Sequence, residues 1–266
     1  MYWWMLAQVK RNGPLSTKFL ENLGLGFYVL LDCLRLYRDI FFGRRKLDLK
    51  MFVDDLREAG LTILLRITLV AIVVGLIIGI QSQNVLDKVN VPELLLGGVG
   101  LSIIKEFSPL LVGFFVAGRS GIALVVRIGS MVLNREIDGL IVSGMNPIQY
   151  IVGPMMLAML LMSFGLAVWV GLVVLSVTSA WLWFQAAIPV TLFQESLGDV
   201  LEPSDLLISI IKPLVFSVLI VLIATVNGCR VGRHVEAVSQ AATRTMISAI
   251  AAILLIDLIF VFIFGT

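Results

Sequence analysis

The sequence predicts an all-α protein that crosses a membrane several times. Of its 266 residues, 59% are hydrophobic and 14% are charged, whereas a soluble domain has about 45–50% apolar and about 25% charged residues. The apolar residues form long runs that match the roughly 20 residues a spanning helix needs. No segment shows the alternating pattern that is typical of a membrane β-barrel. These observations exclude a soluble, disordered or disulfide-stapled chain.

The first expected element is an amphipathic helix over residues 14–42. Its apolar residues recur at helical spacing, but Glu21, Asp32 and Arg35 interrupt them before the segment could cross a bilayer. We expect this helix to lie in the membrane interface, and the alternative is a soluble helix that packs on a partner. The first residues lack the features of a secretory signal, so we expect them to belong to the mature chain.

Five apolar stretches follow and predict five spanning helices. They cover residues 61–81, 92–118, 150–184, 205–226 and 241–264. Residues 1–60 then form a basic N-terminal region, and residues 61–266 form the membrane domain. Ten lysines and arginines lie in residues 1–60 and none lies in the loop 185–204. Because basic loops stay cytoplasmic, the bias predicts a cytoplasmic N-terminus and a periplasmic C-terminus.

Small residues at helical spacing predict close helix crossings. Examples are Gly75 with Gly79, Gly97 with Leu101 beside Gly98, and Gly165 near Gly171. The alternative for any single pair is that glycine is simply common in spanning helices.

The sequence lacks the motifs of common enzymes. It has no phosphate-binding loop, no nucleophile elbow, no zinc-protease motif and a single histidine, His234. Cys33 and Cys229 have no metal-binding or redox spacing, and we expect free thiols. A net charge of +2 gives no reason to expect a nucleic-acid partner. We therefore expect no catalysis, cofactor or metal in this chain, and an energy source that lies elsewhere.

Ionisable residues inside the apolar spans are the main functional candidates, because each costs at least about 2.5–3.5 kcal/mol at mid-bilayer unless it is compensated. Lys105 and Glu106 lie near the middle of the second span. Pro109 cannot donate a hydrogen bond to the Lys105 carbonyl, so we expect a loosened helix and a polar cavity there. The alternative is a structural charge pair with another helix.

The fourth and fifth spans contain similar residues. Asp205, Ser209 and Lys212 share one helix face, but Asp205 and Lys212 are about 10 Å apart by helix rise and should not pair. Asp257 in the fifth span needs a counter-charge, for which Lys212 and Lys105 both remain open. Arg66 lies six residues into the first span, and we expect it to extend to the inner headgroups.

The second loop, residues 117–149, has helical periodicity of its own. Residues 134–142 predict a short amphipathic helix, Gly144 should end it, and Asn146 with Pro147 should begin the next helix. A short helix of this kind on the cytoplasmic side is what a permease would present to a separate ATPase.

Several motifs together resemble the MlaE/YrbE permease family, in order and spacing over residues 50–264. They are Lys105-Glu106-Phe107-Ser108-Pro109, Ala117-Gly118-Arg119-Ser120-Gly121, Ile128-Gly129, Arg135-Glu136-Ile137-Asp138-Gly139-Leu140, Gly144-Met145-Asn146-Pro147-Ile148-Gln149-Tyr150, Ala242-Thr243-Arg244 and Asp257. One departure is Lys105, where the family more often has arginine. A lysine lacks the bidentate fork of arginine, so headgroup recognition should be looser.

The resemblance implies an ABC-type lipid permease in the inner membrane of a double-membraned bacterium. It implies a homodimer on two ATPase subunits that hold ATP and Mg, an MCE-domain hexamer on the other side, and in some systems a STAS-domain protein. It also implies two sets of site residues. The residues expected to contact phospholipid are Lys105, Glu106, Asp205, Lys212 and Asp257, and those expected to couple to the ATPase are Arg135, Glu136, Ile137, Asp138, Leu140 and Met145.

In the resulting hypothesis a phospholipid places its headgroup near Lys105 and Glu106 and its tails on spans one, two and five. One alternative is a transporter or channel driven by an ion gradient, in which the same charges form an ion path. A further alternative is a membrane anchor without transport activity, which would not need these charges.

Overall fold

The computed structural model describes residues 15–43, 49–57, 60, 62–86, 88, 92–232 and 234–264. This described part is helical and contains no strand. Within the described residues, five helical segments are long and apolar enough to cross a membrane, which confirms the predicted all-α fold with five spans. They are Ile63–Leu86, Leu94–Leu133, Ile148–Ala186, Pro203–Cys229 and Val235–Phe264.

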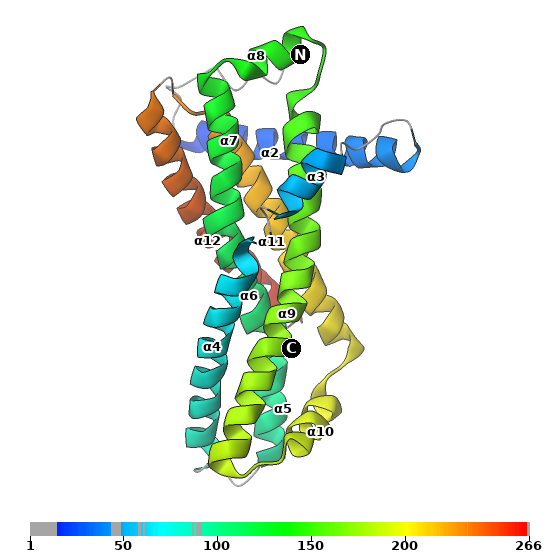
Figure 1. The fold of residues 1–266 in the computed structure, drawn as a ribbon, viewed down its shortest axis with the longest axis vertical. Coiled ribbons are helices and arrows are strands. Elements are labelled where there is room, and N and C mark those ends of the chain that lie inside the picture. Colours follow the sequence, from blue (N-terminus) through cyan, green and yellow to red (C-terminus); the bar gives the residue numbers. More distant parts are fainter. Residues whose placement is uncertain are drawn as a thin grey trace.

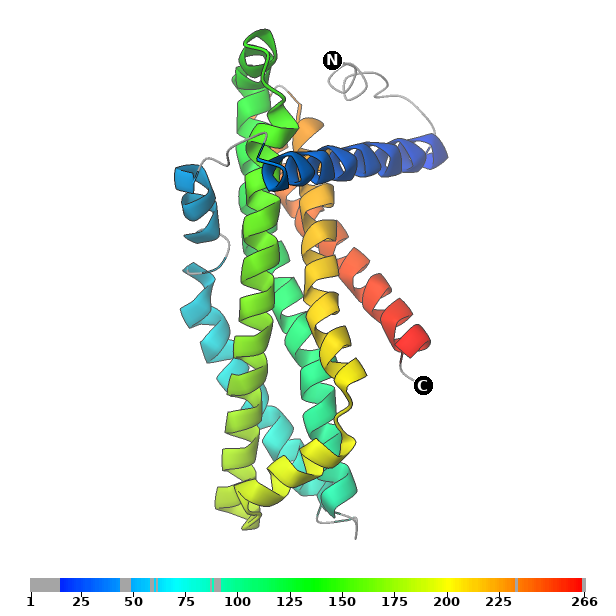
Figure 2. The same cartoon turned by 90° about the vertical axis from the view of Figure 1, so that its right-hand side faces the viewer.

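Helix α2 (Leu15–Phe41) lies across the bundle rather than along it (Figure 2). It confirms the helix predicted over residues 14–42 and ends at Gly43, whose φ of 69° favours glycine. One face is buried at Val29 and Cys33, while Leu23 and Phe27 on another face are exposed. A crosswise helix with a free apolar face fits the membrane interface.

The first span is α4 (Thr62–Leu86), and the short helix α3 (Leu49–Leu56) before it was not predicted. Helix α4 packs along α9 (Gly153–Ala186). A Cβ at Gly75 would come within 2.9 Å of Val177, and a Cβ at Gly79 within 3.0 Å of Trp181. The predicted close crossing at these two glycines is therefore confirmed.

The other glycine predictions have mixed outcomes. A Cβ at Gly97 would come within 2.6 Å of the Ser196 carbonyl oxygen, so this close approach is confirmed. Gly165 and Gly98 have nothing within 4 Å of such an atom, whereas a Cβ at Gly171 would lie 3.5 Å from the Ser108 hydroxyl oxygen, so a helix contact is found at Gly171 and not at Gly165.

The second span is a succession of α5 (Pro92–Ser102), η2 (Ile103–Phe107), α6 (Ser108–Val116), η3 (Ala117–Gly121) and α7 (Ile122–Leu133). We expected this span to end at Gly118, but the helix continues to Leu133, so residues 117–133 are no loop. Arg127 explains the difference, because its Nη1 lies 2.7 Å from Oδ1 of buried Asp55 in α3. The pair compensates the charge that suggested an aqueous loop.

Two prolines coincide with π-helical turns. Segment η2 ends two residues before Pro109, and the Ser108 amide donates to the Ile103 carbonyl five residues back. Segment η4 (Ile148–Val152) has the same relation to Pro154. Proline has no N–H to donate, so the turn before it widens. The helix loosening predicted at Lys105 is confirmed.

The two ends of the bundle carry short helices, which we use to name them (Figure 1). Helix α8 (Glu136–Val142) lies at one end and α10 (Val190–Val200) at the other. Helix α10 was not predicted because its charged residues resemble a loop. Its Phe193 is buried with Leu96 and Leu182 in a small separate core.

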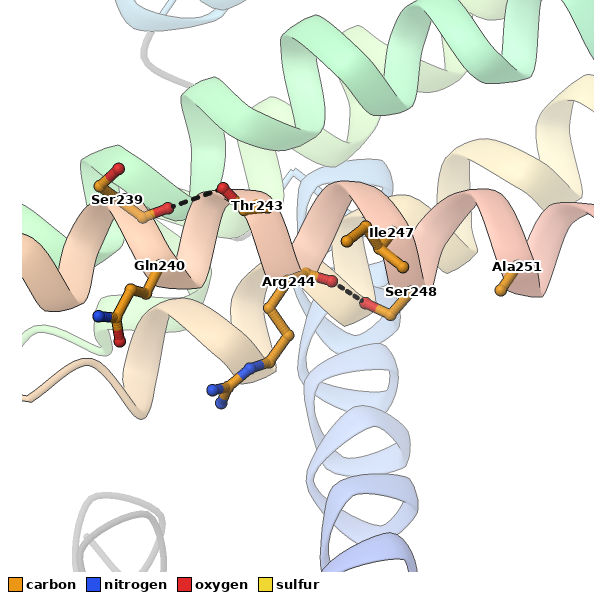
Figure 3. Close-up of a pocket in the computed structure, with 7 residues that line it drawn as sticks. All are labelled: Ser239, Gln240, Thr243, Arg244, Ile247, Ser248 and Ala251. Atoms are coloured by element: carbon orange, nitrogen blue, oxygen red, sulfur yellow. Dashed lines mark hydrogen bonds between the residues drawn. The ribbon is translucent and has the colours of Figure 1, made fainter.

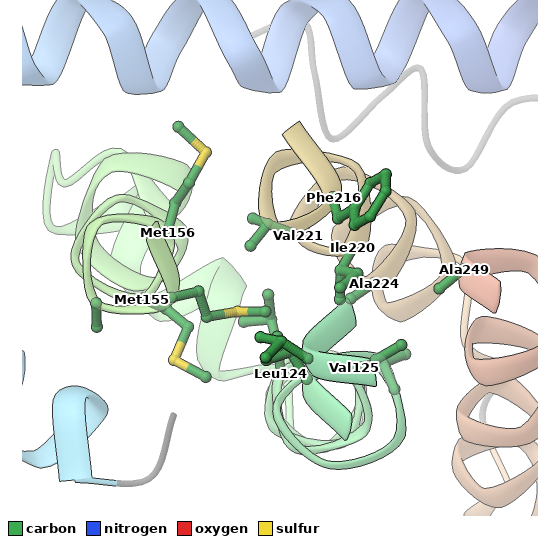
Figure 4. Packing of buried hydrophobic residues seen from close by; sticks show 14 of the residues in the cluster. Leu124, Val125, Met155, Met156, Phe216, Ile220, Val221, Ala224 and Ala249 are labelled. Atoms are coloured by element: carbon green, nitrogen blue, oxygen red, sulfur yellow. The ribbon is translucent and has the colours of Figure 1, made fainter. Parts of the chain in front are cut away.

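Helices α11 (Pro203–Cys229) and α12 (Val235–Phe264) complete the bundle. The main core forms where α7, α9 and α11 meet, with α12 beside them (Figure 4). Leu124, Met155 and Ile220 are each at most 1% exposed there. Helix α11 runs through this core, and its N-terminal half carries two of the charged residues described next.

Candidate functional site

The five charged residues predicted inside the spans meet between η2, α11 and α12. Lys105 and Glu106 are neighbours in η2, Asp205 and Lys212 lie on α11, and Asp257 lies on α12. Cross-helix ion pairs connect them. We call these five residues the charge cluster.

Lys212 is the centre of the cluster, with 1% of its side chain exposed. Its Nζ lies 2.5 Å from Oε2 of Glu106 and 3.0 Å from Oδ1 of Asp257. No described residue donates a hydrogen bond to that oxygen of Asp257, so the second contact is an ion pair without hydrogen-bond geometry. Of the two open candidates, Lys212 is the counter-charge of Asp257.

Lys105 pairs separately with Asp205, Nζ to Oδ1, at 2.8 Å. The other carboxylate oxygen of Asp205 accepts a hydrogen bond from the Glu202 amide at 3.1 Å and completes a capping box at the start of α11. Asp205 and Lys212 do not form an ion pair, as their spacing predicted. Ser209 donates to the Leu206 carbonyl within its own helix.

The cluster compensates its own charges. It contains two lysines and three carboxylates, and each lysine already has a carboxylate partner. Glu106 is its most accessible side chain, at 33%. A phosphate that approached either lysine would have to displace a carboxylate, because Coulomb attraction is strong in this weakly polar environment. Contact between the cluster and a lipid stays a prediction.

A groove of about 640 Å³ follows one face of α12 near the α8 end (Figure 3). Arg244 projects from the helix there, and its carbonyl accepts a hydrogen bond from the Ser248 hydroxyl at 2.7 Å. No cluster residue lines this groove. A second groove, between α4 and the α6–α7 segment, contains two arginines.

Helix α8 confirms the short helix predicted over residues 134–142, but its faces differ from the expectation. Ile137 is 2% exposed and belongs to the main core, so it supports the helix from inside. Arg135 and Glu136 are exposed, and so is Met145, at 44%. Val142, which the sequence reasoning did not select, is 89% exposed. Asp138 and Leu140 are half-buried.

The segment after α8 confirms the predicted stop and start signals. Gly144 has a φ of 79°, its amide donates to Ile141, and the Met145 amide donates to Leu140, which is a Schellman motif. Asn146 Oδ1 accepts a hydrogen bond from the Ile148 amide at 3.1 Å and begins η4.

Asn146 also connects this segment to α2, a link that the sequence reasoning missed. Its Nδ2 donates to Oδ2 of Asp32 at 3.1 Å, and Asp32 is 3% exposed. The Tyr37 hydroxyl donates to the Gly153 carbonyl at 2.8 Å. The crosswise helix is thus fixed to the start of the third span and to the turn after α8. A buried aspartate in an amphipathic helix was the available signal.

Both cysteines are free and buried, as expected. Burial, reinforced by the carboxylate of Asp32, raises the pKa of the Cys33 thiol to about 12. Burial also raises the pKa of Tyr37. Both groups are therefore neutral at physiological pH.

Comparisons with known proteins bear on this arrangement. The family model "Permease MlaE" matches residues 52–263. The chain is 27% identical over 220 residues to the intermembrane phospholipid transport system permease protein MlaE of Haemophilus influenzae, covering 79% of this chain and 80% of that one. Probable ABC transporter permease proteins are also similar, at 29% identity in Synechocystis (68% of each chain) and 24% in Rickettsia prowazekii (91% and 92%).

Proposed function

This chain belongs to the MlaE permease family, and we propose that it is the membrane subunit of an ABC-type transporter that moves phospholipid between the inner membrane and an MCE-domain partner. The charge cluster is the observation on which the proposal depends, because five ionisable residues in an apolar bundle need a function or a structural role. The named function of the Haemophilus relative supports phospholipid as the substrate.

We propose the following assembly. Two copies of the chain bind two ATPase subunits that hold ATP and Mg, and an MCE-domain hexamer binds on the opposite side. A STAS-domain protein joins the ATPase in some systems. The membrane is the inner membrane of a double-membraned bacterium. The similarity to ABC transporter permeases supports the ATPase, while the other partners follow from the family resemblance.

The α8 end is the proposed cytoplasmic end and the α10 end the proposed periplasmic end. Basic residues concentrate near the α8 end, whereas the segment around α10 has only acidic charges. The exposed side chains of Arg135, Glu136, Val142 and Met145 would contact the ATPase. Ile137 would fix α8 to the core so that its displacement moves the bundle.

Transport would use an exchange of ionic partners in the charge cluster. In the described conformation both lysines are paired with carboxylates. A lipid phosphate would replace Asp205 at Lys105 or Glu106 at Lys212, with its tails on spans one, two and five. When ATP binding displaces α8, the bundle closes, the carboxylates return, and the lipid leaves. The two conformations need only differ in their affinity for lipid.

The test is a reconstituted complex with its ATPase, in which co-purified phospholipid and lipid-stimulated ATP hydrolysis are measured. Replacing Lys105 and Glu106 together by alanine should lower both quantities. Lys88→Ala, an exposed residue in the turn after α4, is the matched control and should change neither. Unchanged lipid and unchanged stimulation in the double variant would remove these residues from the substrate path.

The ion-gradient alternative makes a different prediction in the same preparation. If the cluster were an ion path, no ATPase would co-purify, and a pH or sodium gradient would drive transport without ATP. The pairing of every cluster lysine with a carboxylate in one compact group argues against a continuous path through the bundle.

A further inference from the structure

A second charged groove lies between α4 and the α6–η3–α7 segment, apart from the charge cluster. Its volume is about 650 Å³. Arg66 and Arg119 line it together with apolar residues that include Phe114, Phe115 and Ile122. No lining residue is acidic. The groove therefore combines positive charge with an apolar surface.

Hydrogen bonds along α9 show how deep Arg66 lies. Tyr37 of α2 binds the carbonyl of Gly153, and the Trp169 indole donates to the hydroxyl of Thr68 at 2.9 Å. Sixteen residues of α9 separate these two levels, which is about 24 Å at the rise of an α-helix. Arg66 is two residues from Thr68, so it lies about 20 Å from the level of α2.

The groove that Arg66 lines lies between the level of the charge cluster and the α8 end, because Phe114 is eight residues beyond Glu106, which is about 12 Å along a helix. Ser108, two residues from Glu106, donates to the carbonyl of Ala167, which is two residues from Trp169. The expected extension of the Arg66 side chain to the inner headgroups stays a prediction.

Arg66 also differs from the other deep cations in its surroundings. Lys105, Lys212 and Arg127 each have a carboxylate within 3.0 Å. Arg66 forms no ion pair with any residue that the structure describes, and its side chain is exposed to the groove. A guanidinium remains protonated under physiological conditions, so an anion that enters the groove would compensate a charge that no described residue pairs with.

The shape and chemistry of the groove specify that anion. A guanidinium binds a phosphate with two parallel hydrogen bonds. Phe114 and Phe115 lie on the α10 side of Arg119 along the chain, and Ile122 and Val126 lie on its α8 side. A ligand that fills the groove thus needs one phosphate and long apolar chains, which describes a phospholipid rather than inorganic phosphate.

We propose that the groove between α4 and α6–α7 binds an anionic phospholipid, with its phosphate on Arg66 and its acyl chains against Phe114 and Phe115. This site rests on the proposed transport function and adds to it a second headgroup contact, reached from the side of the bundle. It would hold a lipid before the lipid reaches the charge cluster.

Native mass spectrometry of the purified full chain in detergent tests the proposal, with phosphatidylglycerol as the probe. Arg66→Leu should weaken phosphatidylglycerol binding about tenfold or more, and Arg66→Lys should weaken it less, because a lysine keeps the charge but loses the fork. Lys88→Leu is the matched control and should bind like the wild type. Equal binding by wild type and Arg66→Leu would overturn the proposal.

Two further measurements keep the proposal falsifiable. A benzophenone amino acid at Phe115 should crosslink to phosphatidylglycerol in the wild type and lose that crosslink in the Arg66→Leu background. Inorganic phosphate should not compete, and competition would show a simple anion site instead. If Arg66→Leu changes the oligomeric state while lipid binding persists, an acidic residue of a second copy is the counter-charge, and the proposal is wrong.

The result also separates this site from the proposed transport function. The Lys105 and Glu106 double variant should retain phosphatidylglycerol at Arg66 while lipid-stimulated ATP hydrolysis falls. If the double variant loses lipid-stimulated ATP hydrolysis but no phosphatidylglycerol is found at Arg66, only the groove proposal is refuted. If phosphatidylglycerol is bound at Arg66 and the double variant hydrolyses ATP like the wild type, only the transport role of the cluster is refuted.

Discussion

Lys212 shows how a single buried charge can stabilise three helices. Its ammonium group lies between Glu106 of η2 and Asp257 of α12, and it projects from α11. Burying such a group without partners is prohibitive, whereas two carboxylates within 3.0 Å compensate it. The lysine therefore fixes the relative position of the three elements as well as their charge.

Removing this lysine should destabilise the protein strongly. Lys212→Met leaves Glu106 and Asp257 without their counter-charge, and we expect a loss of about 3–5 kcal/mol. Thermal unfolding in detergent measures it. Adding Glu106→Gln and Asp257→Asn to Lys212→Met should restore much of the stability, because the remaining polar groups are neutral. If Lys212→Met is as stable as the wild type, or if the triple variant is no more stable than Lys212→Met, the compensating role of Lys212 is contradicted.

Lys105→Met is the matched comparison for that experiment. Lys105 pairs with one carboxylate, that of Asp205, and this carboxylate still accepts a hydrogen bond from the Glu202 amide after the substitution. We expect a smaller loss of stability than for Lys212→Met.

For individual charged residues, the sequence identified the candidates but could not identify their ion-pair partners. Intramembrane charges are visible because each is costly in an apolar run, and helix rise correctly separates Asp205 from Lys212. Which carboxylate meets which lysine depends on how helices rotate against one another. Asp55 was missed for the same reason, since its partner Arg127 is 72 residues away and looked like part of a loop.

Among the elements, α8 depends on a left-handed glycine at its end. Gly144 has a φ of 79°, and its conformation lets the Met145 amide reach the Leu140 carbonyl. Gly139 lies in the middle of the same short helix, has no positive φ, and has open space where a Cβ would be. The two glycines thus provide a test and its control within one helix.

Gly144→Ala should weaken the end of α8 by about 1–2 kcal/mol, because an alanine is strained in the left-handed region. Hydrogen exchange at the Met145 amide should accelerate accordingly, and coupling to the ATPase should fall. Gly139→Ala should leave that exchange unchanged or slow it, since alanine favours a helix by up to about 1 kcal/mol over glycine. Equal exchange in both variants would show that the Schellman motif does not hold α8.

Helix types and many boundaries were predictable, but continuity between helices was not. Long apolar runs determine the five spans, and local signals at Gly144, Asn146 and Pro109 gave a stop, a start and a loosened turn that are all confirmed. The extension of the second span to Leu133 was not predictable, because a helix tolerates Arg127 only when Asp55 from another element is present. Helix α10 was not predicted for a related reason, since its burial depends on contacts with α5.

Across the whole molecule, the spans differ in how much of their surface is buried by the rest of the chain. Half of the most apolar window of the second span is buried, whereas only 17% of that of the fifth span is. In the C-terminal half of α12, the side chains of Leu254, Leu258 and Phe262 are exposed. Acyl chains or the spans of a second copy would cover this surface, in keeping with the proposed homodimer and with the fifth span as a wall of the lipid path.

The orientation of the bundle in the membrane can be tested with single cysteines at its two ends. Val142→Cys at the α8 end and Lys88→Cys in the turn at the α10 end replace exposed residues. The native thiols should stay silent, because both are buried and the Cys33 pKa is raised to about 12, so only about one thiol in 100,000 is a thiolate at pH 7. An impermeant maleimide added to spheroplasts should label Lys88→Cys at once and Val142→Cys only after the membrane is permeabilised. The unmodified chain should label in neither condition until it is denatured. The opposite order of labelling would invert the proposed topology and move the ATPase away from α8, because nucleotide is available only on the cytoplasmic side.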